Sequence, residues 1–534
     1  MADSTGGNLR QAYSSVCSLG LPVIILICLV LVLVLWRLTR FTLLPLLHPE
    51  EPREVPYWTP FLGHAISYFR DPTRTLTYAR NYFKDDRKPL TINLAGEMMY
   101  VITAPGDVTA VYRNSSTLTM DIFTQDLMRG FGVSESSLDR VFTEPNKDGT
   151  GLQLMAPNPN RKSLAHLTTD HFRMQLSPGD RLTQMGNITL AYVEKALRWE
   201  NMVSQKFVIA HTSSYKDISL LHFCEEVILQ VATRSFFGDA LIDKNPNILE
   251  DFLQFDDVSW KLMYRYPRLL SPNMNKAKDK LIDALEKYFN LPQEERPGAN
   301  WFVQMEEAEF RNFGVPVRDI AKLIASIYWV INTNTYKLLF WMLEFALHDL
   351  ALLQKITEEL NTCFNLDGTL DIPSLQSQSP YLTALFHECL RITNTSSSAR
   401  LVTSDTRIGP YILRSGRRLL IPYQQLHLNT AAFGPNPASF DYTRFLSDPK
   451  LPRNPSFRPF GGGASYCPGR FVAKQEIFMA MAFLLCRFEV GMAVDGVDGK
   501  QKQNFPRRDD AKPGIGIVSP VRGDDLVVRL RIKN

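Results

Sequence analysis

Apolar residues recur with helical spacing through most of the middle of the chain. They return every three or four positions near 217–237, 274–290, 320–348 and 349–364, and short polar or proline-containing loops separate these stretches. Residues three and four apart share one face of a helix, so this spacing predicts helices that bury at least one side. We therefore expect nearly all of 106–400 to be helical.

Two stretches instead show the alternation typical of β-strands. TINLAGEMMYVITAP, residues 91–105, alternates around a glycine turn and predicts an early hairpin. GIGIVSPVRGDDLVVRLRIKN, residues 514–534, alternates around a Gly-Asp-Asp turn and predicts a second, terminal hairpin. Together the patterns predict a mainly α fold with small β-sheets in a single globular domain.

The longest apolar run lies near the N-terminus. No charged residue occurs between Gln11 and Trp36, and the stretch 19–36 is almost entirely aliphatic. Roughly 18 to 20 such residues cross a bilayer as a helix, whereas the apolar part of a cleavable signal is about 7 to 15 residues long. We expect a transmembrane signal anchor at 16–36 behind a short luminal N-terminus at 1–15, in preference to a removed secretory peptide.

The charges beside this run indicate its orientation. Arg37 and Arg40 follow it directly, while Arg10 on the other side is balanced by Asp3. Positively charged residues favour the cytosolic side of a membrane. We expect a single-pass protein of the endoplasmic reticulum membrane with its globular domain in the cytosol.

A proline-rich stretch follows the anchor, with prolines at positions 45, 49, 52, 56 and 60. Proline interrupts helices because it lacks the amide hydrogen and clashes with the preceding turn. We expect 37–60 to be a stiff, non-helical linker. The globular domain is then expected at 61–534.

Composition narrows the class of protein. Of 534 residues, 45% are hydrophobic, 11% aromatic and 21% charged, which excludes a wholly disordered, collagenous or coiled-coil protein. Lys plus Arg (59) and Asp plus Glu (55) nearly balance and are interspersed, so nucleic acid is not an expected partner. The seven cysteines lie far apart without a CxxC pair, which favours buried thiols over a disulfide framework or a zinc site.

One cysteine has surroundings that suit metal ligation. The segment FRPFGGGASYCPGRFVAKQ places three glycines, 461–463, four residues before Cys467. Glycines keep side chains out of the way, and Pro468 supplies the backbone angle of a helix start. At a helix N-terminus the dipole and free amides favour a thiolate, which suits a haem iron with one axial sulfur. The alternative is a turn that ends in a buried cysteine.

Three motifs in order resemble the cytochrome P450 superfamily. Phe460-x-x-Gly463-x-Ser465-x-Cys467-x-Gly469 resembles its haem-ligand loop, and Glu388-x-x-Arg391 resembles its helical Glu-x-x-Arg pair. FGPNPASFDYTRF, residues 433–445, resembles the segment whose arginine completes a buried Glu-Arg-Arg cluster. That third member corresponds to Arg444. The resemblance covers about 57–534 and implies the cytochrome P450 fold, with the haem-thiolate catalytic domain behind one N-terminal transmembrane helix.

The resemblance also implies a cofactor and its contacts. Cys467 is expected to be the axial thiolate ligand of the iron of haem b, and Arg400 to hold a haem propionate. The remaining residues expected to contact the haem are Phe460, Gly461, Gly463, Ser465, Pro468 and Gly469. His166 and Arg173 are further candidates for propionate contacts, with ordinary helix surface as the alternative.

The central helix departs from most members of the family. Most carry an acid followed by a threonine there, which deliver protons to oxygen bound at the iron. Counting back from Trp341 in LIASIYWVINTNTYKLLFWMLEF places Asn334 at the usual threonine and Thr333 at the acid, so no carboxylate is expected at this site. We expect Thr333, Asn334 and Thr335 to be the catalytic residues. Asn334 together with Ser465 resembles the branch of sterol and bile-acid hydroxylases and prostacyclin synthase.

Three functions remain open at this point. The resemblance favours a monooxygenase that oxidises a bulky apolar molecule, a steroid, a terpenoid or another secondary metabolite as in fungal biosynthetic enzymes, using dioxygen and NADPH. NADPH–cytochrome P450 reductase is then the expected electron donor, docked on a cationic face at Lys474, Arg458 and Arg453, for which a solvated surface is the alternative. The second possibility is a haem-thiolate isomerase that rearranges a peroxide substrate without external electrons. The third is a membrane haem-binding protein without turnover.

Overall fold

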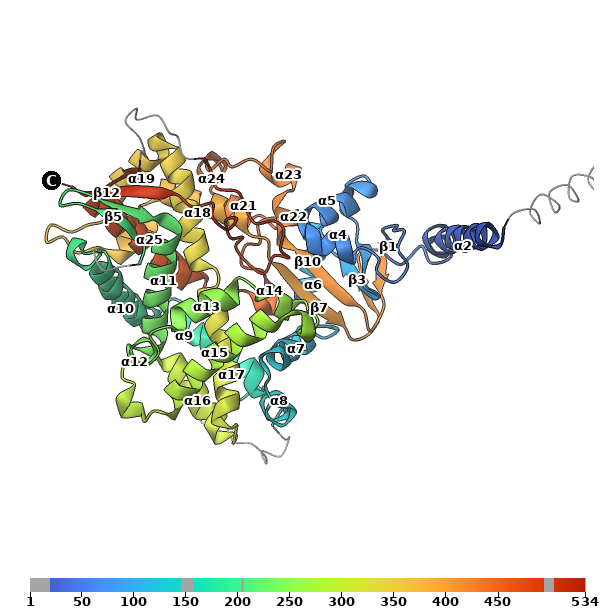
Figure 1. Ribbon diagram of the computed structural model, residues 1–534, viewed down its shortest axis with the longest axis horizontal. Helices are drawn as coiled ribbons and strands as arrows, with labels where there is room; N and C mark the ends of the chain where they lie inside the picture. The colour runs from blue at the N-terminus through green and yellow to red at the C-terminus, as the bar shows by residue number, and fades with distance from the viewer. Residues whose placement is uncertain (1–19, 146–157, 203–205, 494–503, 534) are drawn as a thin grey trace, which may run out of the picture.

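The computed structural model describes residues 20–145, 158–202, 206–493 and 504–533. Helices dominate this part of the chain, and three small sheets accompany them (Figure 1). Residues 1–19, including the expected luminal segment and the start of the expected anchor, lie outside the described residues.

The helices of the N-terminal half are α2 (Leu21–Leu38), α3 (Leu44–Leu47), α4 (Ala65–Arg70), α5 (Pro72–Tyr82), α6 (Pro105–Arg113), α7 (Asp121–Phe131), α8 (Glu135–Phe142), α9 (Leu164–Leu176), α10 (Asp180–Ala196), α11 (Leu220–Phe237), α12 (Ala240–Lys244), α13 (Ile248–Asp256) and α14 (Trp260–Met263). The helices that follow are α15 (Pro272–Asn290), α16 (Trp301–Asn312), α17 (Val317–Asn332), α18 (Thr335–His348), α19 (Leu350–Asn361), α20 (Ile372–Ser377), α21 (Pro380–Thr393), α22 (Tyr423–His427), α23 (Thr430–Phe433), α24 (Thr443–Ser447) and α25 (Arg470–Arg487). Short non-α turns are η1 (Thr39–Leu43), η2 (Trp199–Met202), η3 (Arg268–Leu270), η4 (Gln293–Glu295), η5 (Leu451–Arg453) and η6 (Gly463–Ser465).

The strands form three sheets. A six-stranded sheet has the order β1 (Arg53–Glu54), β2 (Leu90–Leu94), β3 (Glu97–Val101), β10 (Arg418–Pro422), β7 (Ser397–Val402), β4 (Leu118–Thr119). A four-stranded sheet has the order β11 (Phe488–Met492), β12 (Val527–Ile532), β6 (Lys216–Ser219), β5 (Val208–His211), and β8 (Thr406–Ile408) pairs with β9 (Tyr411–Leu413). The first sheet lies at the end of the body nearest α2, and the C-terminus lies at the far end (Figure 1).

The predicted early hairpin is present. Strands β2 and β3 pair in antiparallel register around Ala95 and Gly96. Both turn residues have positive φ, 53° and 91°, as the tight two-residue turns of hairpins require. The helices expected near 217–237, 274–290 and 349–364 are likewise present as α11, α15 and α19.

The predicted terminal hairpin is wrong. β12 forms as expected, but its partners are β11 on one side and β6 on the other. The stretch before it contacts the end of α21 instead, where the amide of Thr395 donates to the carbonyl of Gly516 (2.9 Å). Alternation reports a half-buried strand but not its neighbours, so a distant partner cannot be distinguished from the adjacent segment.

The proline-rich stretch is also more structured than expected. The helix begun by α2 continues through the π-helical turn η1 and through α3 to Leu47, so Pro45 lies inside a continuous helical segment, just after the π-helical turn. Farther along, β1 pairs with β2, and Val55 and Tyr57 are buried in the core beside the first sheet. The globular body therefore includes residues of the expected linker.

The apolar helix is fastened to the body. Residues Leu21–Leu47 form the one described helical segment long and apolar enough to cross a membrane, and none of its most apolar window is buried against the protein. At its end nearest the body, Arg40 forms a bidentate ion pair with Glu54 (2.8 and 3.1 Å), and Arg37 donates to the carbonyl of Tyr57 (2.5 Å). These contacts fix the direction in which the helix leaves the domain.

The main core surrounds the central helix, which consists of α17 and α18. α18 packs against α11, α21 and α25, and most of its residues are buried in the helical body. Its Trp341 is fully buried, and the indole donates to the carbonyl of Val518 (2.7 Å). The expected continuous helix over 320–348 is interrupted at Thr333 and Asn334.

Buried Glu344 on α18 makes stability depend on pH. Neither carboxylate oxygen has a hydrogen-bond partner among the described residues, and the Nδ1 of His348 lies 3.5 Å from one of them. Burial, assisted by the charge of Asp525, raises the pKa of Glu344 from 4.5 to about 8. The unfolded chain thus releases this proton at a lower pH than the folded chain.

Unfolding should release a proton between about pH 4.5 and 8, so stability should fall as the pH rises through this window, by at most about 1.4 kcal/mol per pH unit. Glu344→Gln should remove this contribution, and the gap in melting temperature between variant and wild type should widen as the pH rises. Melting curves of both proteins across the window test this. Parallel pH profiles would contradict it.

Candidate functional site

The loop before α25 is shaped by its glycines. Gly461 and Gly463 have φ of 77° and 60°, and a Cβ at either would lie 2.8 Å from the hydroxyl of Tyr423 or the carbonyl oxygen of Tyr112. The amide of Cys467 donates to the carbonyl of Phe460 (3.0 Å) and closes the loop. Side chains other than hydrogen would push this loop away from its neighbours.

The thiol of Cys467 faces the start of α25. The backbone amides of Gly469 and Arg470 both hydrogen-bond to it, and the Arg470 guanidinium binds the carbonyl of Cys467 (2.7 Å). The helix begins at Arg470 with Gly469 as N-cap, so Pro468 precedes the first turn that it was expected to occupy. Burial raises the pKa of Cys467, while the two amides and Arg470 act in the opposite direction. The thiolate is thus hydrogen-bonded but still needs a bound cation to balance its burial.

A buried cation lies beside the same loop. Arg400 on β7 is 7% exposed, and no carboxylate among the described residues pairs with it. Its guanidinium donates to the hydroxyls of Ser465 (2.6 Å) and Ser398 (2.7 Å) and to the carbonyl of Ala399 (2.7 Å). A buried guanidinium without an acid is costly unless an anion arrives, and a haem propionate is such an anion. The thiol, the glycine-cleared loop and Arg400 together fit haem.

Two tyrosines next to Arg400 were not found from the sequence. The hydroxyls of Tyr112 on α6 and Tyr423 on α22 hydrogen-bond at 2.7 Å, and the guanidinium carbon of Arg400 lies 5.6 Å from the centre of the Tyr112 ring. They approach the loop from two other elements. No local pattern marks them, since neither belongs to a motif.

The other basic candidates take different roles. Arg173 on α9 donates to the carbonyl of Ala464 in the Cys467 loop and pairs with Asp170 at 3.1 Å, whereas His166 pairs with Asp121 on α7 at 3.0 Å. Only Arg173 of the two touches the loop.

The expected cationic face is weaker than the sequence suggests. Arg453 is exposed, but Arg458 is half-buried and donates to Thr109 (3.1 Å). The ammonium of Lys474 lies 4.8 Å from the ring centre of Phe478, and burial lowers the pKa of Lys474.

The structure brings Glu388, Arg391 and Arg444 together in the core. Arg391 forms a bidentate pair with Glu388 (2.6 and 2.7 Å), and neither side chain is exposed. Arg444 lies 3.8 Å from the same carboxylate. Arg391 also donates to three backbone carbonyls, those of His427, Pro437 and Ser439.

His427 links this cluster to the Cys467 loop. Its Nδ1 lies 2.9 Å from the carbonyl of Arg391, and its Nε2 accepts from the amide of Arg458 (3.1 Å). Burial and the charge of Arg391 lower the pKa of His427 to about 3, so the ring is neutral and its Nδ1 carries the proton. The ion pair is therefore connected through one imidazole to the irregular segment that leads into Phe460.

The three expected catalytic residues lie at the interruption of the central helix. Asn334 is half-buried, and its Oδ1 accepts from the amide of Ile517 (2.8 Å). Thr333 and Thr335 are buried, and the hydroxyl of Thr333 donates to Asp256 on α13 (2.5 Å). The central helix itself supplies no carboxylate at this position, but Asp256 on α13 brings one to the hydroxyl of Thr333. Gly516 was also missed; a Cβ there would lie 1.9 Å from the Asn334 oxygen.

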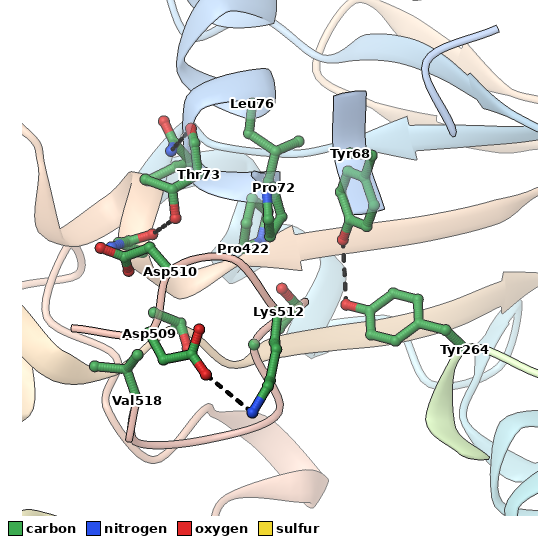
Figure 2. Close-up of a pocket in the computed structure, with 15 residues that line it drawn as sticks. Tyr68, Pro72, Thr73, Leu76, Tyr264, Pro422, Asp509, Asp510, Lys512 and Val518 are labelled. Atoms are coloured by element: carbon green, nitrogen blue, oxygen red, sulfur yellow. Dashed lines mark hydrogen bonds and ion pairs between the residues drawn. The ribbon is translucent and has the colours of Figure 1, made fainter. Parts of the chain in front are cut away.

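A pocket opens between α5, the stretch 509–518 and the end of β10. Its cavity measures only about 20 Å³, roughly the space of one water molecule, and Figure 2 shows its lining. In its lining, the hydroxyls of Tyr68 and Tyr264 hydrogen-bond to each other (3.2 Å), and the ammonium of Lys512 pairs with the carboxylate of Asp509 (2.9 Å). Its wall also includes Thr395, the residue that contacts Gly516. The pocket therefore lies next to the segment that holds Asn334.

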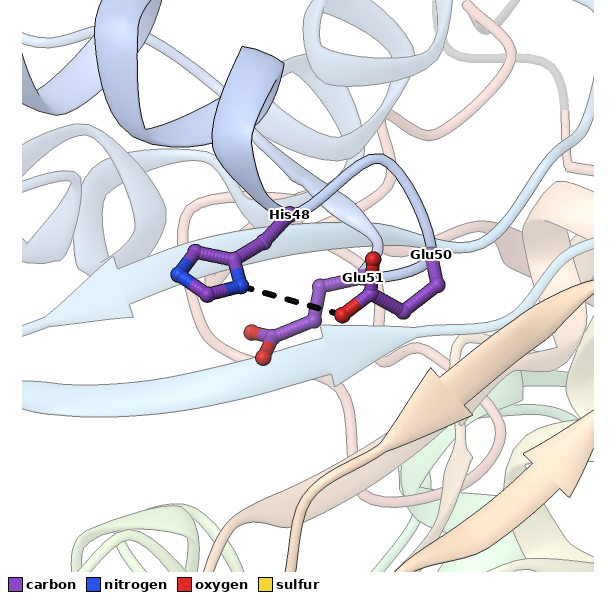
Figure 3. Close-up of side chains that lie close together, drawn as sticks. All are labelled: His48, Glu50 and Glu51. Carbon is purple, nitrogen blue, oxygen red and sulfur yellow. Dashed lines mark ion pairs between the residues drawn. The ribbon is translucent and has the colours of Figure 1, made fainter.

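A second polar group, His48, Glu50 and Glu51, lies just after the apolar helix (Figure 3). Its potential ligand atoms lie within 4.8 Å of one another, but both carboxylates already pair with Arg414 (3.2 and 2.7 Å). This ion-pair network joins the end of the helix to β9 and does not need a metal.

Comparisons with known proteins agree with the geometry. The family model described as Cytochrome P450 matches residues 54–507. The Cytochrome P450 monooxygenase poxD of Penicillium oxalicum is 24% identical to the chain, covering 85% of it and 90% of that protein. Cytochrome P450 7A1 of Oryctolagus cuniculus is 24% identical over 91% of the chain and 94% of its own length. The cholesterol 7-alpha-monooxygenase of Cricetulus griseus is 24% identical over 67% and 73%.

Arg391→Ala should prevent recovery of haem-loaded protein. It leaves the carboxylate of Glu388 buried and uncompensated, at a cost of roughly 3 to 5 kcal/mol. The ratio of haem absorbance to protein after purification measures the effect, and Arg453→Ala, which removes an exposed arginine, serves as control. Soluble, normally loaded Arg391→Ala would show that the pair does not hold the site.

Proposed function

The chain belongs to the cytochrome P450 family, and from that premise we propose that it oxidises a bulky apolar small molecule with dioxygen and electrons derived from NADPH. It is an oxidoreductase of the P450 monooxygenase type, and its cofactor is haem with iron and a cysteine axial ligand. The predicted family, fold and cofactor are thus confirmed. The observation that carries the proposal is the Cys467 thiol, which faces two backbone amides beside the buried Arg400, a cation that pairs with no carboxylate in the described part of the chain.

Each residue near the loop has a proposed role. Cys467 ligates the iron, and Arg400 neutralises a propionate with help from Ser465. The other residues of the loop keep the surface flat: Phe460, Gly461, Gly463, Pro468 and Gly469. Bound haem supplies the activation of dioxygen and the insertion of one oxygen atom into a C–H bond.

The distal residues hold and orient protons. The amide of Ile517 is a donor, so the atom of Asn334 that it faces is the oxygen, and the Nδ2 hydrogens point elsewhere. No described residue accepts from that nitrogen. We assign Asn334 as a donor to a distal water or ligand, with Thr333 and Thr335 on either side of it. An amide does not exchange protons as an acid does, so water completes the transfer.

The remaining assignments concern place and partners. Cytochrome P450 monooxygenases need a redox partner and take apolar substrates. We propose NADPH–cytochrome P450 reductase as that partner, and an endoplasmic reticulum membrane entered by the segment 16–36. Arg37 and Arg40 favour a cytosolic catalytic domain. The contacts of Arg40 and Glu54 support a domain held at a set angle to the membrane.

The substrate class rests on the relatives. One is named for cholesterol 7-alpha-monooxygenation and another is a monooxygenase of Penicillium. We propose a steroid, a terpenoid or a comparable secondary metabolite.

Isotopically heavy dioxygen tests the function. The protein and its reductase are presented with apolar extract from cells lacking the gene, with and without NADPH, and metabolites are compared by mass spectrometry. We expect a product that needs NADPH and carries one heavy oxygen atom. A substrate consumed without NADPH or label would establish peroxide rearrangement instead, and no consumption at all would favour haem binding without turnover.

A further inference from the structure

The central helix is interrupted at residues 332–335, a run of residues whose side chains weaken a helix but do not by themselves break it. α17 ends at Asn332 and α18 begins at Thr335, yet no proline or glycine occurs from 323 to 345. Helices bend sharply at such residues or where a side chain inserts into the hydrogen-bond ladder. Something outside the helix must therefore hold the interruption.

The carboxylate of Asp256, at the end of α13, is placed to do so. Asp256 is 4% exposed. Its Oδ1 accepts from the hydroxyl of Thr333 (2.5 Å) and the indole of Trp329 (3.1 Å). Its Oδ2 accepts from the hydroxyl of Tyr336 (2.9 Å) and pairs with the ammonium of Lys337 (2.7 Å). One carboxylate thus holds donors from both sides of the break.

Charge explains why an acid is needed at this point. Lys337 is 4% exposed and lies in the first turn of α18, where the helix dipole disfavours a cation. The ionised Asp256 compensates for both the buried cation and the positive end of the helix. Without it, Lys337 would be a buried charge with no described carboxylate partner.

The same helix end reaches the loop on the other side of Asn334. Asp257, the next residue, pairs with Lys512 at 2.7 Å, and that loop continues to Ile517, whose amide binds the oxygen of Asn334. Asn334 thus directly follows Thr333, whose hydroxyl is bound by Asp256, and its own side chain is bound by Ile517 of the loop that Asp257 contacts. Residues at the end of α13 therefore contact both the helix and the loop beside Asn334.

We propose that Asp256 is a positioning residue for the distal side of the site. It supplies from α13 the carboxylate that the central helix lacks, and it acts by holding the interruption at Thr333, which keeps Asn334 where its Oδ1 accepts from the amide of Ile517. This inference rests on the proposed function, since it assigns Asn334 to the distal side. It assigns Asp256 no contact with substrate or cofactor.

Asp256→Asn combined with Lys337→Met is the decisive variant, because it removes both buried charges together and leaves none unpaired. Its matched control is Asp251→Asn with Lys280→Met, which removes a more exposed ion pair of the same helix α13 (2.7 Å) that, among the described residues, has no contact with the central helix break. Both are studied as the full-length, haem-loaded protein. The readouts are haem content, backbone deuterium exchange over 333–338 and the ferric Soret maximum, none of which needs substrate or NADPH.

We expect normal haem content in both variants. In the Asp256 variant alone, exchange over 333–338 should rise by roughly tenfold or more, and the Soret maximum should shift as the distal polar groups move. Unchanged exchange, or faster exchange with an unshifted Soret maximum, would overturn the proposal, since a purely structural residue gives the latter result. A wild-type protein that forms no labelled product would refute the proposed function without touching these readouts.

If the double variant does not fold, Tyr336→Phe decides. It removes one hydrogen bond to the carboxylate and leaves the ion pair with Lys337 intact. A smaller change in the same two readouts supports the proposal, and no change in either overturns it.

Discussion

The site depends on the buried ion pair between Glu388 and Arg391. Burying two charges gains little stability by itself, because desolvation offsets most of their attraction. Its value lies in what the pair orders: Arg391 donates to three backbone carbonyls, the amide of Asp441 donates to Glu388, and His427 carries the connection on to Arg458. The loop that ends at Cys467 thus begins from a point fixed by two charges in the core.

The sequence was sufficient for features that depend on local chemistry. Helical spacing predicted α11, α15 and α19, and a glycine turn predicted the hairpin of β2 and β3. The glycines before Cys467 predicted a loop that other segments approach closely, and the positive φ of Gly461 explains why. Each of these follows from backbone sterics or period, which a short window of residues contains.

Features built by tertiary contact could not be predicted in this way. Proline at 45 suggested an end to the helix, but the helix continues past it after a π-helical turn. Alternation before β12 suggested a neighbouring strand that does not exist. Asp256 arrives from a helix almost eighty residues before Thr333, and Tyr112 and Tyr423 meet across more than three hundred. Such partners leave no periodic or motif pattern in one sequence.

The central claim is that Cys467 is the thiolate ligand around which these contacts are organised. The absorption spectrum of the reduced carbon-monoxide complex tests it most directly, with Cys467→Ser compared with Cys486→Ser, another half-buried cysteine. The account predicts that the red-shifted band is lost in Cys467→Ser and kept in Cys486→Ser. A red-shifted band retained in Cys467→Ser would show that another residue ligates the iron and would contradict the account.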